Sequence, residues 1–324
     1  MQMPKDSGLE MLDRIVRRSM RYYSEAFKSL NTGINNANAA KSGTAFRLPS
    51  LDTVRSTVKD TVESLFKGLN DTVSQLTAKP ERVNYNAVVS SFLPPGARLL
   101  KPKYPESASE IQFADLDNDK RSELVASYKT TEGIRTIILK KDEVQWYKLA
   151  EISSPEYEGI HYRNHADMTG DAKNLLLLGL EPKSGPRTIF AYSLADGNAK
   201  KIFSRKYHLL ELQKPHGSTT SARASLALWN EESPEIYDIE LVRWNGLELE
   251  QLDHSRYLEG KVVPYYIRKL KLNPNDTVSW YNLANVMAKA GDSSNASAAV
   301  KIALERNPDA ALRDKFNALS SRLG

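Results

Sequence analysis

Two stretches near the start of the chain repeat apolar residues every three or four positions, which predicts amphipathic helices. In residues 9–30, basic residues are interleaved with the apolar ones. In residues 51–76, the apolar stripe is narrow, like the seam of a coiled coil. Residues 31–50, rich in Asn, Ala, Gly and Ser, predict a flexible linker. We therefore interpret residues 1–80 as a helical arm.

Two kinds of surface could bind this arm, another protein surface or a membrane. Narrow apolar stripes usually pack on protein, which here would be the neighbouring domain or a second copy of the chain, so a homo-oligomer stays open. A basic amphipathic helix can instead lie on an anionic membrane surface. Residues 9–30 are the segment of the arm that has this basic pattern.

From residue 81 to 255 the pattern changes to short runs of β-branched and aromatic residues, which predicts strands. Three hairpin-like units follow one another, at residues 123–152, 174–207 and 224–253. The dipeptides Asp196-Gly197 and Asn245-Gly246 stand between such runs and favour tight hairpin turns. We expect an antiparallel β-repeat body.

An acidic loop precedes the first unit. Asp115, Asp117, Asp119 and Glu123 stand at loop positions 1, 3, 5 and 9, with Arg121 at position 7. This spacing suits calcium, which takes carboxylate oxygens from alternate positions and a backbone carbonyl from position 7. Position 6, where such loops need glycine, is Lys120. The sequence leaves two interpretations open, a turn held by its own side chains and a weak calcium site.

A second acidic loop begins 52 residues later, where Asp167 and Asp171 match Asp115 and Asp119. With these loops, the region resembles the FG-GAP or VCBS class of β-propeller-type repeats, whose blades carry a calcium loop before a strand. Closed propellers usually need four or more blades, and this chain has about three. The resemblance therefore implies a partial propeller, either an open assembly covered by helices or one completed by a second chain.

The last region, residues 256–324, returns to helical spacing. Large, small and helix-ending residues fall where a tetratricopeptide repeat has them, at Trp280, Leu283, Ala284, Gly291, Ala296, Ala303 and Pro308. Residues 263–276 resemble the second helix of a preceding repeat, and residues 309–324 predict a closing helix. The resemblance implies binding of a peptide or protein, and the repeated small residues serve close helix packing.

Composition narrows the function. The 324 residues are 40% hydrophobic, enough for real cores, and contain no cysteine, which excludes disulfides, thiolate metal sites and thiol nucleophiles. Residues 1–50 hold eight Lys or Arg against four acids, so +4 of the net charge of +5 is local and a nucleic-acid-binding body is not expected. No signal peptide or membrane span is predicted, which favours a cytoplasmic or membrane-peripheral protein, or an extracellular one if an upstream leader was removed.

Sequence motifs for phosphate, dinucleotide, nucleophile-elbow and zincin sites are absent. His161, His165 and Asp167 cluster in sequence, and we interpret the histidines as solvated loop residues rather than metal ligands.

Taken together, these patterns predict a multidomain α+β protein of N-terminal amphipathic helices, a β-repeat body and tetratricopeptide-like helices. We expect a non-enzymatic protein-interaction or scaffold protein that binds a protein partner. No cofactor is predicted, apart from the calcium that the acidic loop leaves open. The alternative is a carbohydrate-binding protein or hydrolase built on the β region.

Overall fold

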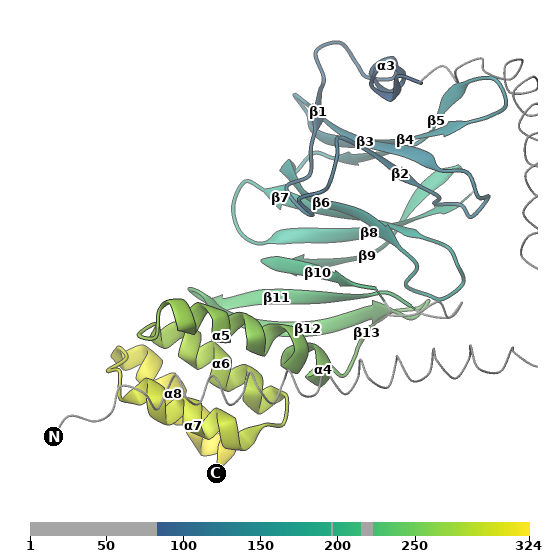
Figure 1. Cartoon of the computed structure of the whole chain (residues 1–324). Helices are drawn as coiled ribbons and strands as arrows, with labels where there is room; N and C mark the ends of the chain where they lie inside the picture. Colours follow the sequence, from purple (N-terminus) through teal and green to yellow (C-terminus); the bar gives the residue numbers. More distant parts are fainter. Residues whose placement is uncertain (1–82, 196, 215–222) are drawn as a thin grey trace, which may run out of the picture. The chain divides into compact units, whose positions relative to one another are not determined.

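A computed structural model describes residues 83–324, apart from residue 196 and residues 215–222 (Figure 1). The amphipathic arm predicted for residues 1–80, with its membrane alternative at residues 9–30, lies outside the described residues. What is described combines antiparallel sheets with helices, which confirms the mixed α+β class.

The first sheet contains the first predicted hairpin unit. Its strands are ordered β1-β3-β4-β5, and β2 also pairs with β3. A turn between Thr130 and Gly133 joins β3 to β4 and sets their register, in which Leu124 lies opposite Leu139. The strands are β1 (Arg98–Leu100), β2 (Ile111–Ala114), β3 (Glu123–Thr130), β4 (Gly133–Lys141) and β5 (Trp146–Ser154).

The second and third sheets each consist of four antiparallel strands in sequence order. The turn predicted at Asn245-Gly246 joins β12 to β13, with Gly246 at a φ of 108° that favours glycine. The second sheet comprises β6 (Tyr157–Ala166), β7 (Leu175–Pro182), β8 (Arg187–Ala195) and β9 (Asn198–Tyr207). The third comprises β10 (Leu209–Gln213), β11 (Ser225–Ser233), β12 (Ile236–Trp244) and β13 (Leu249–Gln251).

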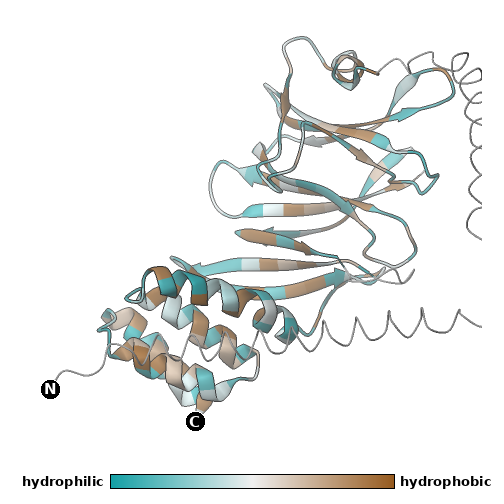
Figure 2. Ribbon diagram, in the orientation of Figure 1, coloured by the Kyte–Doolittle hydropathy of each residue, from teal (hydrophilic) through white to brown (hydrophobic). Residues whose placement is uncertain are grey.

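The sheets stack face to face because the central strand of each is apolar on both faces. In β7, for example, every residue from Leu175 to Leu180 is buried. Leu176 and Leu178 pack toward the first sheet, whereas Leu175 and Leu177 join a core with the third. Figure 2 shows the same feature as hydrophobic stretches in the middle of the strands.

Helices follow the third sheet at the places that the sequence predicts. Three of them begin with an aspartate that caps the backbone N–H three residues on: Asp276, Asp292 and Asp309. Trp280 and Leu283, which fall at large-residue positions of the predicted repeat, are both 0% exposed. The helices are α4 (Ser255–Tyr257), the π-helical turn η1 (Leu258–Val262), α5 (Val263–Leu272), α6 (Thr277–Lys289), α7 (Ser293–Leu304) and α8 (Ala310–Leu323). Their assignment to the tetratricopeptide family stays a prediction.

Helices cover both outer faces of the stack. Trp229 and Ile239 of the third sheet share one core with the C-terminal helices, and Val89 of α3 (Tyr85–Ser90) packs with the outward residues of the first sheet. In the described part of the chain no core joins the first sheet to the third, so the arrangement is open. None of the helices described has the length and apolar character needed to cross a membrane.

Candidate functional site

The acidic loop lies between β2 and β3, and its first aspartate holds its shape. The Asp115 carboxylate accepts hydrogen bonds from the backbone N–H groups of Asn118, at 2.7 Å, and Lys120, at 3.1 Å. Asn118 and Lys120 have φ angles of 64° and 69°, in the left-handed region. Lys120 thus takes the backbone conformation that calcium loops reserve for glycine, as the loop spacing predicts, at a cost in strain.

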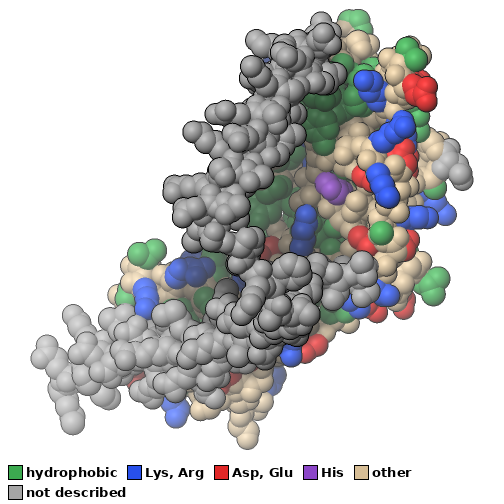
Figure 3. Space-filling view, turned by 45° about the vertical axis from the view of Figure 1, so that its right-hand side comes forward, with side chains coloured by type: hydrophobic (Ala, Val, Ile, Leu, Met, Phe, Trp, Pro, Cys, Tyr) green, Lys and Arg blue, Asp and Glu red, His purple; other side chains and the backbone are tan. Residues whose placement is uncertain are grey.

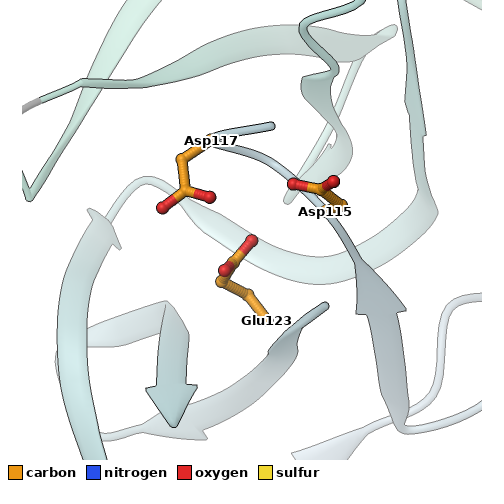
Figure 4. Close-up of side chains that lie close together, drawn as sticks. All are labelled: Asp115, Asp117 and Glu123. Carbon is orange, nitrogen blue, oxygen red and sulfur yellow. The ribbon is translucent and has the colours of Figure 1, made fainter. Parts of the chain in front are cut away.

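Three of the predicted ligands come together. Oxygens of Asp115, Asp117 and Glu123 lie within 4.8 Å of one another, and Figure 4 shows their carboxylates pointing toward a common centre. Asp119 and Arg121 are not part of this group; the Arg121 backbone N–H donates to Asp119 Oδ1 at 2.8 Å.

A residue that the sequence analysis missed lies against this cluster. The Lys140 ammonium nitrogen of β4 contacts Asp117 Oδ2, lies 2.7 Å from Asp119 Oδ2 and lies 3.6 Å from Glu123 Oε1. The register that pairs Leu124 with Leu139 places Lys140 opposite Glu123. The chain therefore supplies its own cation to the acidic loop.

Glu123 is the buried member of the cluster, with 0% of its side chain exposed. Its Oε2 accepts from the Leu116 backbone N–H at 2.8 Å, whereas its Oε1 has no hydrogen-bond partner. Burial raises the pKa of Glu123, partly opposed by the bond from Leu116. The Lys140 ammonium is the charge that offsets this buried carboxylate.

The pKa shifts of Lys140 and Asp119 are both those expected of an ion pair. The hydrogen bond from Lys140 lowers the pKa of Asp119. Desolvation of Lys140 by itself would lower the Lys140 pKa, but its bonds to Asp117 and Asp119 outweigh that effect and raise it. At neutral pH both Lys140 and Asp119 are therefore charged.

The loop fits an ammonium group better than a calcium ion. Calcium needs six to eight oxygens, and both Asp115 oxygens are engaged by backbone N–H groups. An incoming ion would have to displace Lys140 or bind beside its positive charge. Of the two interpretations that the sequence left open, this geometry favours a turn held by its own side chains.

The second loop repeats the turn without the ion pair. Asp167 accepts from the backbone N–H groups of Gly170 and Ala172, which matches Asp115 with Asn118 and Lys120 at a constant offset of 52 residues. Leu175 stands where the first loop has Glu123. The two loops thus share a fold-shaping role, and only the first has a charge cluster.

The histidines of residues 161–167 correct one sequence-based interpretation. His161 and His165 lie on strand β6 and are partly buried, not solvated in a loop. His161 Nδ1 lies 2.9 Å from Tyr207 Oη, and His165 Nδ1 lies 3.3 Å from Gln112 Nε2. Each ring thus contacts a different partner through its Nδ1 atom.

A second candidate site is a hollow of about 400 Å³ between the second and third sheets and the helix that follows them. Exposed Tyr104, Leu209 and Tyr265 line it, together with the mostly buried rings of Trp229 and Tyr257. Glu211 is its one carboxylate among the described lining residues, and it accepts from Tyr257 Oη at 2.9 Å and pairs with Lys261 at 3.6 Å. We call this hollow the aromatic groove.

The aromatic groove runs beside the edge of a sheet. Strand β10 pairs with β11 on one side, and no described strand pairs with its other side. Lys261 and Arg268 add positive charge from η1 and α5. Figure 3 shows one face of the molecule, on which hydrophobic, basic and acidic side chains are interspersed.

Comparison with family models, curated proteins and solved structures found no match to this chain.

Proposed function

We propose that this chain is a non-catalytic protein-binding module that takes an extended, acidic segment of a partner protein into the aromatic groove. The observation that carries the proposal is the juxtaposition of exposed Tyr104, Leu209 and Tyr265 with an edge of β10 that pairs with no strand in the described part of the chain. A peptide strand can pair with such an edge while alternate side chains enter an apolar hollow.

The charges that line the aromatic groove favour an acidic partner segment. Glu211 is already engaged by Lys261 and Tyr257, so Arg268 is the basic lining residue with no ion pair among the described residues. An acidic side chain on the partner segment would complement it. Aromatic and arginine side chains at the centre of an interface commonly dominate binding.

The alternative of a sugar-binding or hydrolytic site has less support. Glycoside hydrolysis uses a pair of carboxyl groups, and the aromatic groove offers only Glu211 among its described lining residues. Trp229 and Tyr257 are mostly buried, which leaves Tyr104 and Tyr265 as exposed ring faces.

The test is to pan a random peptide library displayed on phage against the intact protein and to measure affinities of synthetic hits by fluorescence anisotropy. We expect acidic peptides with apolar alternate residues, and affinity about tenfold lower or worse in Arg268→Glu and in Tyr265→Asp. Arg313→Glu, an exposed arginine on α8, is the matched control and should bind as the wild type does.

Peptides that bind equally well to all four proteins would place the interface elsewhere and overturn the proposal. A glycan array is the second arm. Saccharide binding that is lost in Tyr265→Asp but retained in Arg268→Glu would favour the carbohydrate-binding alternative instead.

A further inference from the structure

A second, smaller cavity lies between strand β6 and the segment that leads into β2. Its volume is about 190 Å³, and its polar lining residues are Ser107, Ser109, Gln112, Arg163 and Asn164. No carboxylate is among its described lining residues. Pockets for drug-sized ligands measure about 300–1,000 Å³, so this cavity suits something smaller.

Arg163 is the unusual member of this lining, because only 2% of it is exposed. Its Nη2 donates to the carbonyl oxygens of Ser109, at 2.7 Å, and Glu110, at 2.8 Å, and its Nη1 to Ser127 Oγ at 3.3 Å. All three acceptors are uncharged, and no ion pair to Arg163 occurs in the described part of the chain. A buried charge without a counter-charge is costly.

The guanidinium group also keeps a donor free. Arg163 Nε is buried and has no hydrogen-bond partner. Burial lowers the pKa of Arg163 to about 10, and no carboxylate opposes the shift. Because arginine stays protonated at neutral pH, the positive charge persists inside the protein.

A second polar group in the cavity is unpaired as well. Gln112 Oε1 is buried without a partner, while its Nε2 lies 3.3 Å from His165 Nδ1. A half turn of the amide exchanges its two ends and presents the NH₂ group to the cavity side as a donor. Glu106 and Glu110, the acids of the neighbouring segment, are exposed and do not line the cavity.

We propose that this cavity binds a small oxyanion, a phosphoryl or carboxylate group, on Arg163. The guanidinium group matches the geometry of such anions and would gain the counter-charge that the protein lacks. The Ser107 hydroxyl and the Asn164 amide are further donors in the lining.

The experiment is calorimetric titration of the intact protein with inorganic phosphate, phosphoserine and acetate, with sodium chloride of equal ionic strength as the blank. We expect saturable binding of at least one of the three ligands. The midpoint of thermal unfolding of the protein should rise with the concentration of that ligand. Binding of phosphate and phosphoserine assigns a phosphoryl group, and binding of acetate alone assigns a carboxylate.

Arg163→Gln keeps hydrogen-bonding atoms but removes the charge, and should weaken binding about tenfold or more. If that variant does not fold, Ser107→Glu decides, because it places a carboxylate beside the cavity and should abolish anion binding while the protein stays folded. Ser184→Glu, an exposed serine in the loop between β7 and β8, is the matched control. No binding by the wild type, or unchanged binding in Arg163→Gln or Ser107→Glu, overturns the proposal.

Discussion

Replacing Lys140 by methionine tests whether this lysine acts as the internal cation of the acidic loop. The substitution keeps a long apolar side chain but removes the charge that Asp117, Asp119 and Glu123 share. Losing one partner of a buried ion pair costs about 3–5 kcal/mol, and an exposed pair contributes about 0–1 kcal/mol. Lys140 is 15% exposed and Glu123 is 0% exposed, while the aspartates are more open. We therefore expect a loss of about 2–3 kcal/mol in the free energy of unfolding.

Urea unfolding at neutral pH, in the presence of a chelator, measures that loss. The matched control is Lys141→Met, the next residue on β4, which is exposed and should change little. The loss in Lys140→Met should shrink as the pH falls through the raised pKa of Glu123, because protonation removes the uncompensated buried charge.

Calcium gives the same variant a second readout. Without the ammonium group, the carboxylates of Asp117, Asp119 and Glu123 lose their internal cation, and a calcium affinity near 10⁻³ M is about what extracellular calcium modules show. At tenfold that concentration, calcium would restore about 1.4 kcal/mol to Lys140→Met and nothing to the wild type. Equal stability of Lys140→Met and the wild type, or tight calcium binding by the wild type, would refute the assignment of Lys140.

Three further predictions concern the body and the helices. Trp280→Ala should cost about 3–5 kcal/mol in urea unfolding, because the ring is fully buried; an unchanged transition would contradict the packing of α6. Gly179→Ala should cost about 1–3 kcal/mol, because a Cβ atom there would overlap both Tyr207 Oη and Tyr162 Cβ. Adding Tyr207→Phe removes the first overlap and should recover part of the loss; no recovery would mean that the hydroxyl overlap is not the main cause. Burial lowers the pKa of His161 from 6.5 to about 4, so the stability it confers is present above pH 6.5 and declines as the pH falls toward 4. Urea midpoints should show this decline in the wild type and a weaker one in His161→Gln; identical profiles would be evidence against it.

The strongest local signals predicted most of the β architecture. Short runs of β-branched and other apolar residues predicted β3, β7 and β11, and the structure shows why they are so apolar: these strands are covered on both faces. The first strand of the second sheet was missed, because β6 is rich in polar residues and its pairing with β7 shifts register between Ile160 and Tyr162. Its histidines therefore looked like loop residues.

The acidic loop shows the same limit at the level of a site. The sequence identified its carboxylates and the strained position of Lys120, both of which depend on local spacing. Lys140 lies across a hairpin, and its place opposite Glu123 follows from the register that the two-residue turn between Thr130 and Gly133 imposes. Counting outward from that turn would have found it. The buried Arg163 had no such signal, because its environment depends on how two sheets meet.

The helices that cover both ends of the stack also affect which parts of the molecule unfold locally. Each sheet shares a core only with its immediate neighbours among the described residues, so the β body is a short linear array. Loss of α3 or of the C-terminal helices would expose one outer sheet and leave the middle sheet packed on both faces. Amide hydrogens of β7 and β8 should accordingly be the slowest of the β body to exchange with solvent, with protection decreasing toward both ends.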